Sequence, residues 1–264
     1  MATRSYFAPK VEIPRPLYIG LGLASVGVIF ALWCLLTYGG LTPPDFLAAP
    51  HLVAEAAVKR IGNGTLLDNT EASLSVILLG FLFASLLSVP LGILMGSFKV
   101  VEAVVEPITG FMRYIPVSAL IPLLILWVGI GLEQKVWVIF LGTFFQQLIL
   151  ISDVSRGVSK DLIDCSYTLG ATKRQVIWRV LLPACMPGVM DNLRVTMGWA
   201  WTYLVVAELV AANSGLGYMI LNAMRGLFTD VILLGVFTIG ILGLITDTIF
   251  KVLRRRLLPW SAEF

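Results

Sequence analysis

The sequence predicts an all-α integral membrane protein with six transmembrane helices, and three observations lead to this fold class. Hydrophobic residues make up 58% of the 264 residues and charged residues only 13%, whereas a soluble domain carries roughly 25% charged residues. The apolar residues are concentrated in six separate runs, and the mean hydropathy of the chain is +0.91. The basic residues are also distributed unevenly between these runs. We therefore expect lipid to be the solvent for most of the chain.

Three of the six runs are long and nearly free of charge, as a transmembrane helix of about 20 residues requires. They are Leu17–Tyr38, Ala72–Phe98 and Val231–Phe250. The first run follows basic residues, as the apolar part of a signal peptide does. It is longer than the roughly 7–15 apolar residues of a signal peptide, so we expect it to be a retained first helix.

The other three runs are shorter or carry charge. They are Ile115–Ile130, Val136–Ile151 and Leu193–Ala212. The first two are close to the lower length limit for a span and could instead be helices buried in the core. Pro116 and Pro122 predict a kink in the third run of the chain, and the fifth contains Arg194 and Glu208.

The positions of the basic residues predict the orientation of the chain. With both termini in the cytoplasm, nearly all of the 19 Lys and Arg lie in cytoplasmic segments. The exceptions are Lys59, Arg60, Lys135 and Arg225. Cytoplasmic loops of membrane proteins carry an excess of Lys and Arg. If either short run did not cross the membrane, every segment after it would lie on the opposite side and the excess of basic residues in the cytoplasm would be lost. The distribution of Lys and Arg therefore also supports six spans.

We expect four segments along the chain. Residues 1–16 form a cytoplasmic N-terminal segment, and 17–71 the first transmembrane helix with a periplasmic segment. Residues 72–250 form the core transmembrane domain, with a cytoplasmic loop at 153–190, and 251–264 a basic cytoplasmic tail. In the periplasmic segment, His51–Ile61 predicts a short amphipathic helix. Small residues along Ala72–Phe98, among them Gly92 and Gly96, predict close packing within the chain rather than a dimer contact.

The cytoplasmic stretch Asp161–Pro183 predicts two short helices joined by a turn. Ser159 can cap the first helix with its hydroxyl group. Asp161 and Asp164 lie in the first turns, where the helix dipole favours acidic side chains. Gly170 is expected to end this helix, because glycine accepts the left-handed backbone of a helix C-cap.

The second helix of this stretch is expected to begin at Thr172, which can form a capping box with Gln175. Its apolar stripe consists of Val176, Val180 and Leu181. Pro183 is expected to end the helix because proline has no N–H group to donate. These residues leave two interpretations open: a hairpin lying on lipid headgroups, or a docking element for a soluble partner.

The order Asp164-Cys165-Ser166-x-x-x-Gly170, followed after twelve residues by Pro183, resembles the EAA loop of membrane subunits of binding-protein-dependent ABC importers. That family has Glu-Ala-Ala-x-x-x-Gly and a later Ile-x-Leu-Pro. In this chain Asp164 replaces the Glu, and Cys165 and Ser166 replace the two Ala, so the acidic and small character of these positions is retained. Further motifs over about residues 45–260 resemble the nitrate, sulfonate, taurine and bicarbonate branch. They are Arg113-x-x-Pro116, Pro122-Leu123, Trp127-x-Gly129-x-Gly131, Ala207-Glu208, Gly215-Leu216-Gly217 and Arg254-Arg255-Arg256-x-x-Pro259-Trp260.

The resemblance implies a type I ABC importer permease bundle (MetI-like) in the bacterial inner membrane. It implies a second copy of this chain, two cytosolic ATPase subunits that each clamp one coupling loop, and a periplasmic substrate-binding protein. The cargo would be a small oxyanion: sulfonate, taurine, nitrate or bicarbonate. The residues of the coupling loop would be Asp161, Asp164, Cys165, Ser166, Gly170, Ala171 and Pro183. ATP and Mg are expected on the ATPase subunits, because this chain has no G-x-x-x-x-G-K-[ST] loop.

Candidate pathway residues are Ser118, Trp199, Thr202, Tyr203 and Glu208. Glu208 is the only acid well inside the fifth run, and a carboxylate in the membrane is a functional candidate by default. We favour a role in helix packing or gating, because an anionic cargo would be repelled. Trp199 and Tyr203 share a helix face, and Ser118 and Thr202 could offer hydroxyl groups to an oxyanion.

Other function classes fit less well. A secondary transporter or channel working without ATPases predicts inverted repeats, which the sequence does not show. An intramembrane enzyme is disfavoured because His51 is the only histidine and hydrolase motifs are absent; we expect no catalytic and no metal-binding residues. The basic run after the last span is explained by topology and anionic lipid, without nucleic acid. Arg194 and Asp247 are expected to reach water separately as interfacial charges.

Overall fold

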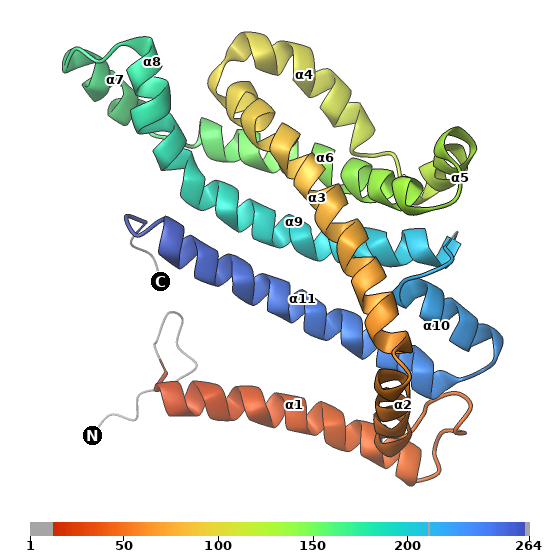
Figure 1. Ribbon diagram of the computed structural model, residues 1–264. Helices are drawn as coiled ribbons and strands as arrows, with labels where there is room; N and C mark the ends of the chain where they lie inside the picture. Colours follow the sequence, from red (N-terminus) through yellow and green to blue (C-terminus); the bar gives the residue numbers. More distant parts are fainter. Residues whose placement is uncertain (1–12, 211, 262–264) are drawn as a thin grey trace, which may run out of the picture.

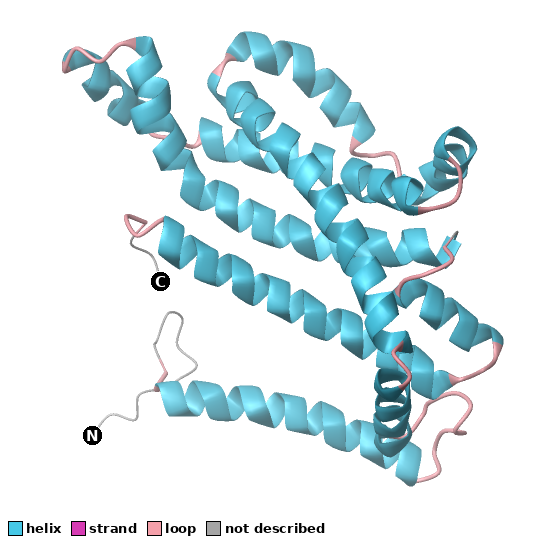
Figure 2. Ribbon diagram, in the orientation of Figure 1, coloured by secondary structure: helices cyan, strands magenta, loops and turns pink. Residues whose placement is uncertain are grey.

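The computed structural model describes residues 13–210 and 212–261, which form helices and connecting turns without a strand (Figure 2). The order along the chain is shown in Figure 1. The elements are α1 (Arg15–Tyr38), α2 (Pro50–Gly62), α3 (Thr65–Ser97), α4 (Lys99–Met112), α5 (Val117–Val128), α6 (Leu132–Arg156), α7 (Lys160–Thr168), α8 (Lys173–Val176), the π-helical η1 (Ile177–Leu181), α9 (Leu182–Val210), α10 (Leu216–Arg225) and α11 (Thr229–Leu257).

Four helices in the described residues are long and apolar enough to cross a membrane: α1, α3, α6 and α11. They contain the first, second, fourth and sixth predicted runs. The fourth run lies within a helix of 25 residues, so its extent was underestimated. Charged side chains near both ends of α6 had limited the apolar run, although the helix continues through them.

The third predicted run is not one straight span. The helix within it, α5, has 12 residues and would be about 18 Å long, short of a hydrocarbon core of about 30 Å. It follows α4 at an angle of 94°. The break lies at residues 113–116, where the sequence predicts a kink at Pro116. Helical backbone is disfavoured for the residue before a proline, here Ile115. Pro122 lies inside α5 without ending it. The helix α4 was not predicted.

Residues 193–210 of the fifth run lie in α9, a helix of 29 residues. The helix α9 is long enough to span the membrane, but Asp191, Arg194 and Glu208 interrupt its apolar sequence. Adding the bent α4–α5 pair gives up to five helical candidates by length and composition. A count of six spans therefore stays a prediction.

The centre of the bundle is the pair α3 and α6, which crosses with α9. The glycines of α3 make this approach possible: a Cβ at Gly80 would lie 2.8 Å from Ile139 Cβ, and one at Gly92 would lie 2.9 Å from Ile151 Cβ. A larger residue would push the helices apart. The expectation that small residues serve packing within the chain is confirmed for these glycines.

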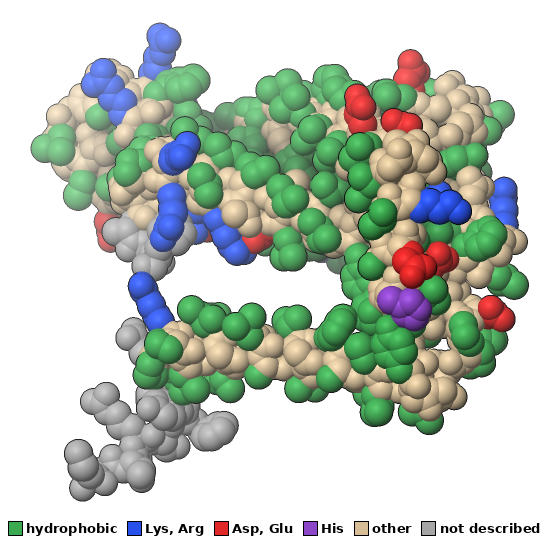
Figure 3. Space-filling view, turned by 60° about the horizontal axis from the view of Figure 1, so that its bottom comes forward, with side chains coloured by type: hydrophobic (Ala, Val, Ile, Leu, Met, Phe, Trp, Pro, Cys, Tyr) green, Lys and Arg blue, Asp and Glu red, His purple; other side chains and the backbone are tan. Residues whose placement is uncertain are grey.

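Helix α1 stands apart from the rest of the bundle (Figures 1 and 3). None of its residues is buried. It is attached near its C-terminal end, where Trp33 Nε1 donates to the carbonyl oxygen of Ala48 at 3.0 Å and its ring lies 5.5 Å from that of Phe237. In a membrane, lipid or protein would cover its remaining surface.

Two further elements complete the end of the molecule where α1 is attached. The predicted amphipathic helix His51–Ile61 is confirmed as α2. The helix α10 was not predicted, because its ten residues lie in a stretch assigned to a loop. The expected start of the core domain at residue 72 lies inside α3. Most of the expected N-terminal segment, residues 1–12, and the last three residues of the tail lie outside the described residues.

The expectation that Arg194 and Asp247 act as separate charges is wrong. Arg194 Nε of α9 donates to Asp247 Oδ1 of α11, and Lys251 Nζ lies 2.7 Å from Asp247 Oδ2. Arg254 Nη1 of α11 also lies 2.7 Å from Asp191 Oδ1 of α9. Helices α9 and α11 run side by side here, so their charged side chains form ion pairs with each other and do not extend separately into water.

Candidate functional site: the hairpin and the Glu208 anchor

The hairpin consists of α7, the turn at Gly170, α8 and η1, and it projects from one end of the bundle (Figure 1). Gly170 has the predicted left-handed backbone, with φ of +82°. Its N–H donates to Tyr167 at 2.9 Å, and the N–H of Ala171 donates to Ser166 at 3.0 Å. These two bonds form a Schellman motif. Ser159 lies at the N-cap of α7 but makes no capping hydrogen bond with its side chain, contrary to the prediction.

The second helix of the hairpin begins as predicted. The Thr172 hydroxyl accepts from the Gln175 N–H, and the Gln175 side-chain oxygen accepts from the Thr172 N–H at 2.8 Å. Val176 and Leu181 are buried, which confirms two members of the apolar stripe. The stripe packs toward the ends of α3 and α6, and the opposite side faces outward.

Pro183 does not end this helix, contrary to the prediction. It is the second residue of α9, and the chain runs as helix from Lys173 through η1 to Val210. Within η1 the bonding widens, and the Leu182 N–H donates to the carbonyl oxygen of Ile177. A π turn directly before proline changes the hydrogen-bond register, so the helix continues without the bond that proline cannot make. The hairpin is therefore joined to α9 without a break in helical structure.

The predicted coupling residues lie mainly on the exposed part of the hairpin. Asp161, Asp164, Cys165 and Gly170 are exposed, while Ser166 and Ala171 are half-buried. The tip residue Leu169 is 87% exposed. Pro183 lies at the base, where its carbonyl oxygen accepts from Trp260 Nε1 at 3.4 Å. Six of the seven predicted residues thus lie on α7 and the turn that follows it, with Asp161 at the far end of α7, and Pro183 lies apart from them.

Basic side chains surround the hairpin. On the face shown in Figure 3, most Lys and Arg side chains lie toward the hairpin end and most Asp and Glu side chains toward the other. Lys173 Nζ lies 5.5 Å from the centre of the Phe98 ring at the end of α3. Next to it, a hydrogen bond from Lys99 holds the pKa of Glu102 below its ordinary value, and Arg156 adds to this effect.

At the other end of α9, Glu208 is fully buried and hydrogen-bonded. Ser73 Oγ of α3 donates to Glu208 Oε1 at 2.8 Å, and the Gly217 N–H at the start of α10 donates to Oε2 at 2.7 Å. The Leu216 N–H donates to Ser73 Oγ at 2.8 Å. The first N–H groups of a helix carry partial positive charge, which strengthens hydrogen bonds to the carboxyl oxygens that accept from them.

The turn before α10 is held by two more bonds. The Gly215 N–H donates to Asn69 Oδ1 at 2.9 Å, and Lys135 Nζ donates to the carbonyl oxygen of Ser214 at 3.1 Å. Lys135 is 4% exposed. Together with Glu208 and Ser73, these residues join α3, α6, α9 and α10; we call the group the Glu208 anchor. Sequence reasoning named Glu208 as a candidate residue and quoted Gly215-Leu216-Gly217 as a motif. It did not connect them with Ser73, Asn69 and Lys135, which are distant in the chain.

The candidate pathway residues differ in exposure. Glu208 faces α3 and α10. Thr202 and Ser118 are exposed and Trp199 is 39% exposed. The Tyr203 ring packs so closely on Gly142 that a Cβ there would lie 2.8 Å from ring atom Cε2. Their role in a pathway stays a prediction.

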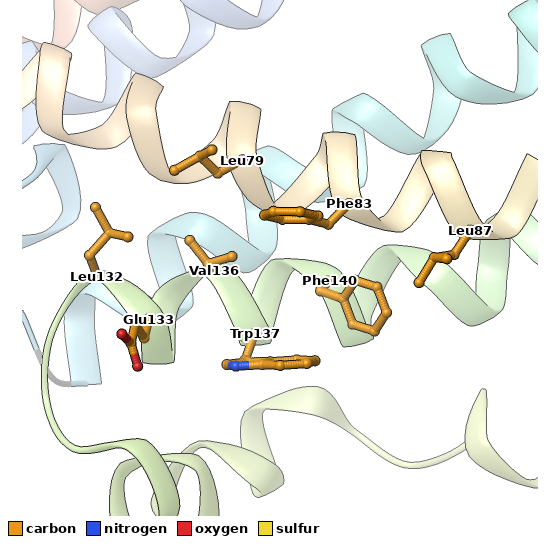
Figure 4. A pocket seen from close by; sticks show the side chains of 8 residues that line it. All are labelled: Leu79, Phe83, Leu87, Leu132, Glu133, Val136, Trp137 and Phe140. Carbon is orange, nitrogen blue, oxygen red and sulfur yellow. The ribbon is translucent and has the colours of Figure 1, made fainter.

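A groove with a volume of about 390 Å³ lies between α3 and α6 (Figure 4). Its lining residues are Leu79, Phe83, Leu87, Leu132, Glu133, Val136, Trp137 and Phe140. Apart from Glu133 at one end, they offer only aliphatic and aromatic surface. Such a groove suits a lipid chain or another helix, since the indole N–H of Trp137 is the single donor among the side chains that line it. In the described part of the chain, no three His, Cys, Asp or Glu residues are grouped as metal ligands.

Comparisons with known proteins agree with this architecture. Residues 88–259 match the family described as binding-protein-dependent transport system inner membrane component. The chain is 33% identical over 259 residues to the taurine transport system permease protein TauC of Escherichia coli K12, covering 96% of this chain and 94% of that protein. It is 34% identical over 243 residues to the putative aliphatic sulfonates transport permease protein SsuC of Bacillus subtilis 168, covering 92% and 88%.

Solved structures show the same fold at lower identity. The inward-facing methionine ABC transporter MetNI matches with a TM-score of 0.59 and 22% identity, over 70% of this chain and 94% of that chain. A bacterial alginate ABC transporter, in complex with a periplasmic protein bound to an alginate pentasaccharide, matches with a TM-score of 0.62 and 13% identity, over 92% and 97%. The chain therefore belongs to the family of binding-protein-dependent transport system inner membrane components and has the fold of a type I ABC importer permease.

Proposed function

We propose that this chain is the permease subunit of an ATP-driven importer of small oxyanions, with sulfonates such as taurine as the favoured cargo. The relatives named for taurine and aliphatic sulfonates support the cargo class. In this proposal, two copies of the chain form the pathway. Two ATPase subunits carry ATP and Mg on the cytoplasmic side, and a periplasmic binding protein delivers the cargo.

The observation that carries the coupling role is the continuous helix from the hairpin into α9. The turn is braced by the Schellman motif and the capping box, and its exposed tip has surface for a partner. Because α8, η1 and α9 are joined helically, a force on the tip would move α9. Coupling of this kind requires a stiff element linked to a bundle with two states.

A pull-down tests this role. The tagged full chain, extracted from its host in mild detergent, is expected to retain a stoichiometric ATPase subunit. Leu169→Glu places a charge on the exposed tip and should release that subunit. Phe46→Glu is the matched control, because Phe46 is 82% exposed in the loop before α2, at the other end of the bundle. Gly170→Pro, which is incompatible with the turn, should act like Leu169→Glu.

Uptake separates the importer from its alternative. The complete complex in liposomes should accumulate radiolabelled taurine only with binding protein and with ATP on the ATPase side. A chain that purifies alone and transports without ATP would be a secondary transporter or channel, and the importer proposal would fail.

The orientation has a built-in reporter. Cys165 on the hairpin is exposed, Cys185 is buried and Cys34 half-buried. If the hairpin and both termini are cytoplasmic, a membrane-impermeant maleimide should label the chain in inside-out vesicles and not in right-side-out vesicles. Cys165→Ser should abolish this labelling. Labelling of Cys165 in right-side-out vesicles would reverse the proposed topology.

A further inference from the structure

A polar pocket lies between α2, α3 and α10, at the end of the bundle away from the hairpin (Figure 1). Its volume is about 240 Å³, the share of liquid volume of roughly eight water molecules. Its polar walls are Arg60 of α2, Thr65 and Asn69 of α3, and Tyr218 and Asn222 of α10. None of the residues that line this pocket is acidic, so its charge favours an anion.

Arg60 is the one charged side chain that lines this pocket, and it is not committed to a neighbour. It is half-buried, and it makes no ion pair and no hydrogen bond with the described residues. A basic side chain in the last turn of a helix can bond the last carbonyl oxygens. Arg60 lies in the last turn of α2 without such a bond. Its guanidinium group therefore has all five N–H donors available to a ligand.

Three neutral groups in the same pocket can also donate. They are the hydroxyl groups of Thr65 and Tyr218 and the side-chain amide of Asn222, and none of them is hydrogen-bonded within the described part of the chain. Asn69 is already engaged, because it donates to the Thr65 carbonyl oxygen at 2.7 Å and accepts from the Gly215 N–H. One guanidinium group with three neutral donors matches a phosphate group, whose oxygens accept several hydrogen bonds at once.

A second pocket adjoins the first, because Arg60 and Phe228 line both. Its volume is about 340 Å³, and its other charged walls are Lys59 and Asp230. The charges of Lys59 and Asp230 are equal and opposite, so one positive charge remains across the two pockets. A group with a single negative charge would balance it, and the second pocket gives room for the atoms attached to that group.

The surface beside the two pockets is apolar. Large apolar side chains, each more than half exposed, lie next to the lining residues in the sequence: Val58, Ile61, Leu67, Leu227 and Phe228. We call this set the apolar rim. Clustered apolar surface of this kind marks a contact with a partner or a membrane. The rim lies where α3 and α11, two helices long enough to cross a membrane, begin, which places it at the boundary between headgroups and acyl chains.

The backbone at Leu227 points to the same contact. Its φ of +54° lies in the left-handed region, which glycine and asparagine occupy more readily than leucine. Leu227 is 71% exposed, so packing within the chain does not explain a leucine at this position. An apolar contact outside the chain does.

We propose that the two pockets bind one phospholipid, with its phosphodiester on Arg60 and its acyl chains over the apolar rim. The Thr65 and Tyr218 hydroxyl groups and the Asn222 amide donate to the remaining phosphate oxygens. Because these donors come from α2, α3 and α10, the bound lipid holds the three helices together beside the Glu208 anchor. A free oxyanion would satisfy the donors but leave the apolar rim uncovered. This lipid site goes beyond the proposed function and does not depend on the cargo.

Lipid binding to the purified full chain tests the site. The chain is stripped of lipid in a sugar detergent, which contains no phosphate, and titrated with the short-chain lipid dihexanoyl phosphatidylglycerol. The unfolding temperature is expected to rise to a plateau, because a ligand that binds the folded chain stabilises it. Arg60→Gln should weaken the apparent affinity at least about tenfold, since hydrogen bonds between charged groups are the stronger ones. Tyr218→Phe should weaken it less, by about threefold.

Arg225→Gln is the matched control. Arg225 is an exposed arginine at the end of α10 and lines neither pocket, so its loss removes the same charge from the same end of the bundle. Its affinity for the lipid should stay unchanged. No plateau with the native chain, or equal weakening by Arg60→Gln and Arg225→Gln, would overturn the proposal. If Arg60→Gln does not fold, Tyr218→Phe decides, and an unchanged affinity of that variant would count against the site.

Two further probes identify the source of the phosphate group. Glycerophosphoglycerol has the phosphodiester without acyl chains, and dihexanoylglycerol has the chains without the phosphodiester. Both are expected to stabilise the native chain far less than the complete lipid. Equal stabilisation by glycerophosphoglycerol would assign the pocket to a free oxyanion, and equal stabilisation by dihexanoylglycerol would show that Arg60 does not recognise the headgroup. Either result would overturn the phospholipid site, and both leave the proposed import of sulfonates untouched.

Discussion

The hairpin and the Glu208 anchor lie at the two ends of α9, and they are built in opposite ways. In the hairpin, the defining hydrogen bonds join residues at most five positions apart, and the side chains are largely exposed. In the anchor, Glu208 bonds to a serine 135 positions away in the sequence, and both are fully buried.

This difference predicts different consequences of mutation. Short-range bonds form from local backbone geometry, so a change in the hairpin should alter its shape while the bundle stays folded. Long-range buried bonds require several helices in place, and an unpaired buried group is costly. Changes in the anchor should therefore reduce stability most, and changes in the hairpin should reduce coupling most.

The largest loss of stability is expected from Glu208→Ala. It removes the acceptor of the Gly217 N–H and of the Ser73 hydroxyl, and we expect a cost of about 3 kcal/mol in the free energy of unfolding. Thermal and denaturant unfolding of the purified chain in detergent measure it. Glu208→Gln keeps one acceptor oxygen and should lose less. Equal stability of Glu208→Ala and the exposed-site control Glu55→Gln would contradict the anchor.

A smaller loss is expected when a methyl group is forced into the anchor. Gly215 has φ of +115°, and a Cβ there would collide with the Glu208 carboxylate. Gly215→Ala should cost about 2 kcal/mol through overpacking and strain. Gly198→Ala in α9 is the matched control, because a Cβ there meets nothing within 4 Å. The same unfolding experiment should show no loss for Gly198→Ala; similar losses for both would rule out a specific contact.

In the hairpin, Gly170→Ala should cost only about 1 kcal/mol, because the left-handed backbone is strained for alanine while the surrounding space is open. We expect a much larger effect on function: weaker retention of the ATPase subunit and lower cargo-stimulated ATP hydrolysis. Gly170→Asn should recover part of both, because asparagine tolerates this backbone better. If ATPase retention and cargo-stimulated ATP hydrolysis fall no more than the loss of folding stability explains, the hairpin has no role in coupling beyond stabilising the fold.

The smallest effect is expected from Thr172→Ala, which removes one half of the capping box. The cost should be about 0.5 kcal/mol, since this cap is exposed. Faster hydrogen exchange of the Gln175 amide would report the local loss, while Thr172→Ser should retain protection. If Thr172→Ala also accelerated hydrogen exchange of amides in α9, the stability of the hairpin would be coupled to that of the bundle.

The sequence-based predictions succeeded for features held by short-range contacts and failed for features held by long-range contacts. The turn at Gly170, the capping box and the amphipathic α2 depend on residues close in the chain, and all three were predicted. The helices α4 and α10 were missed because their sequences mix charged and apolar residues. Their apolar faces pack mainly against α3 in the case of α4, and against α11 and α9 in the case of α10. Pro183 was misjudged because the π turn before it is not visible in residue type. The untested roles of the coupling and pathway residues stay predictions.

By itself, the sequence determined that this chain is a helical membrane protein, where its longest apolar helices lie and which loop forms a braced hairpin. Those properties follow from hydrophobicity summed over about 20 residues and from hydrogen bonds within single turns. Tertiary structure alone decided that Glu208 holds α10, that Arg194 pairs with Asp247, and that Arg60 and Tyr218 line one pocket. These groups are far apart in the chain, and only the packing of α2, α3, α9, α10 and α11 brings them within hydrogen-bonding or electrostatic reach.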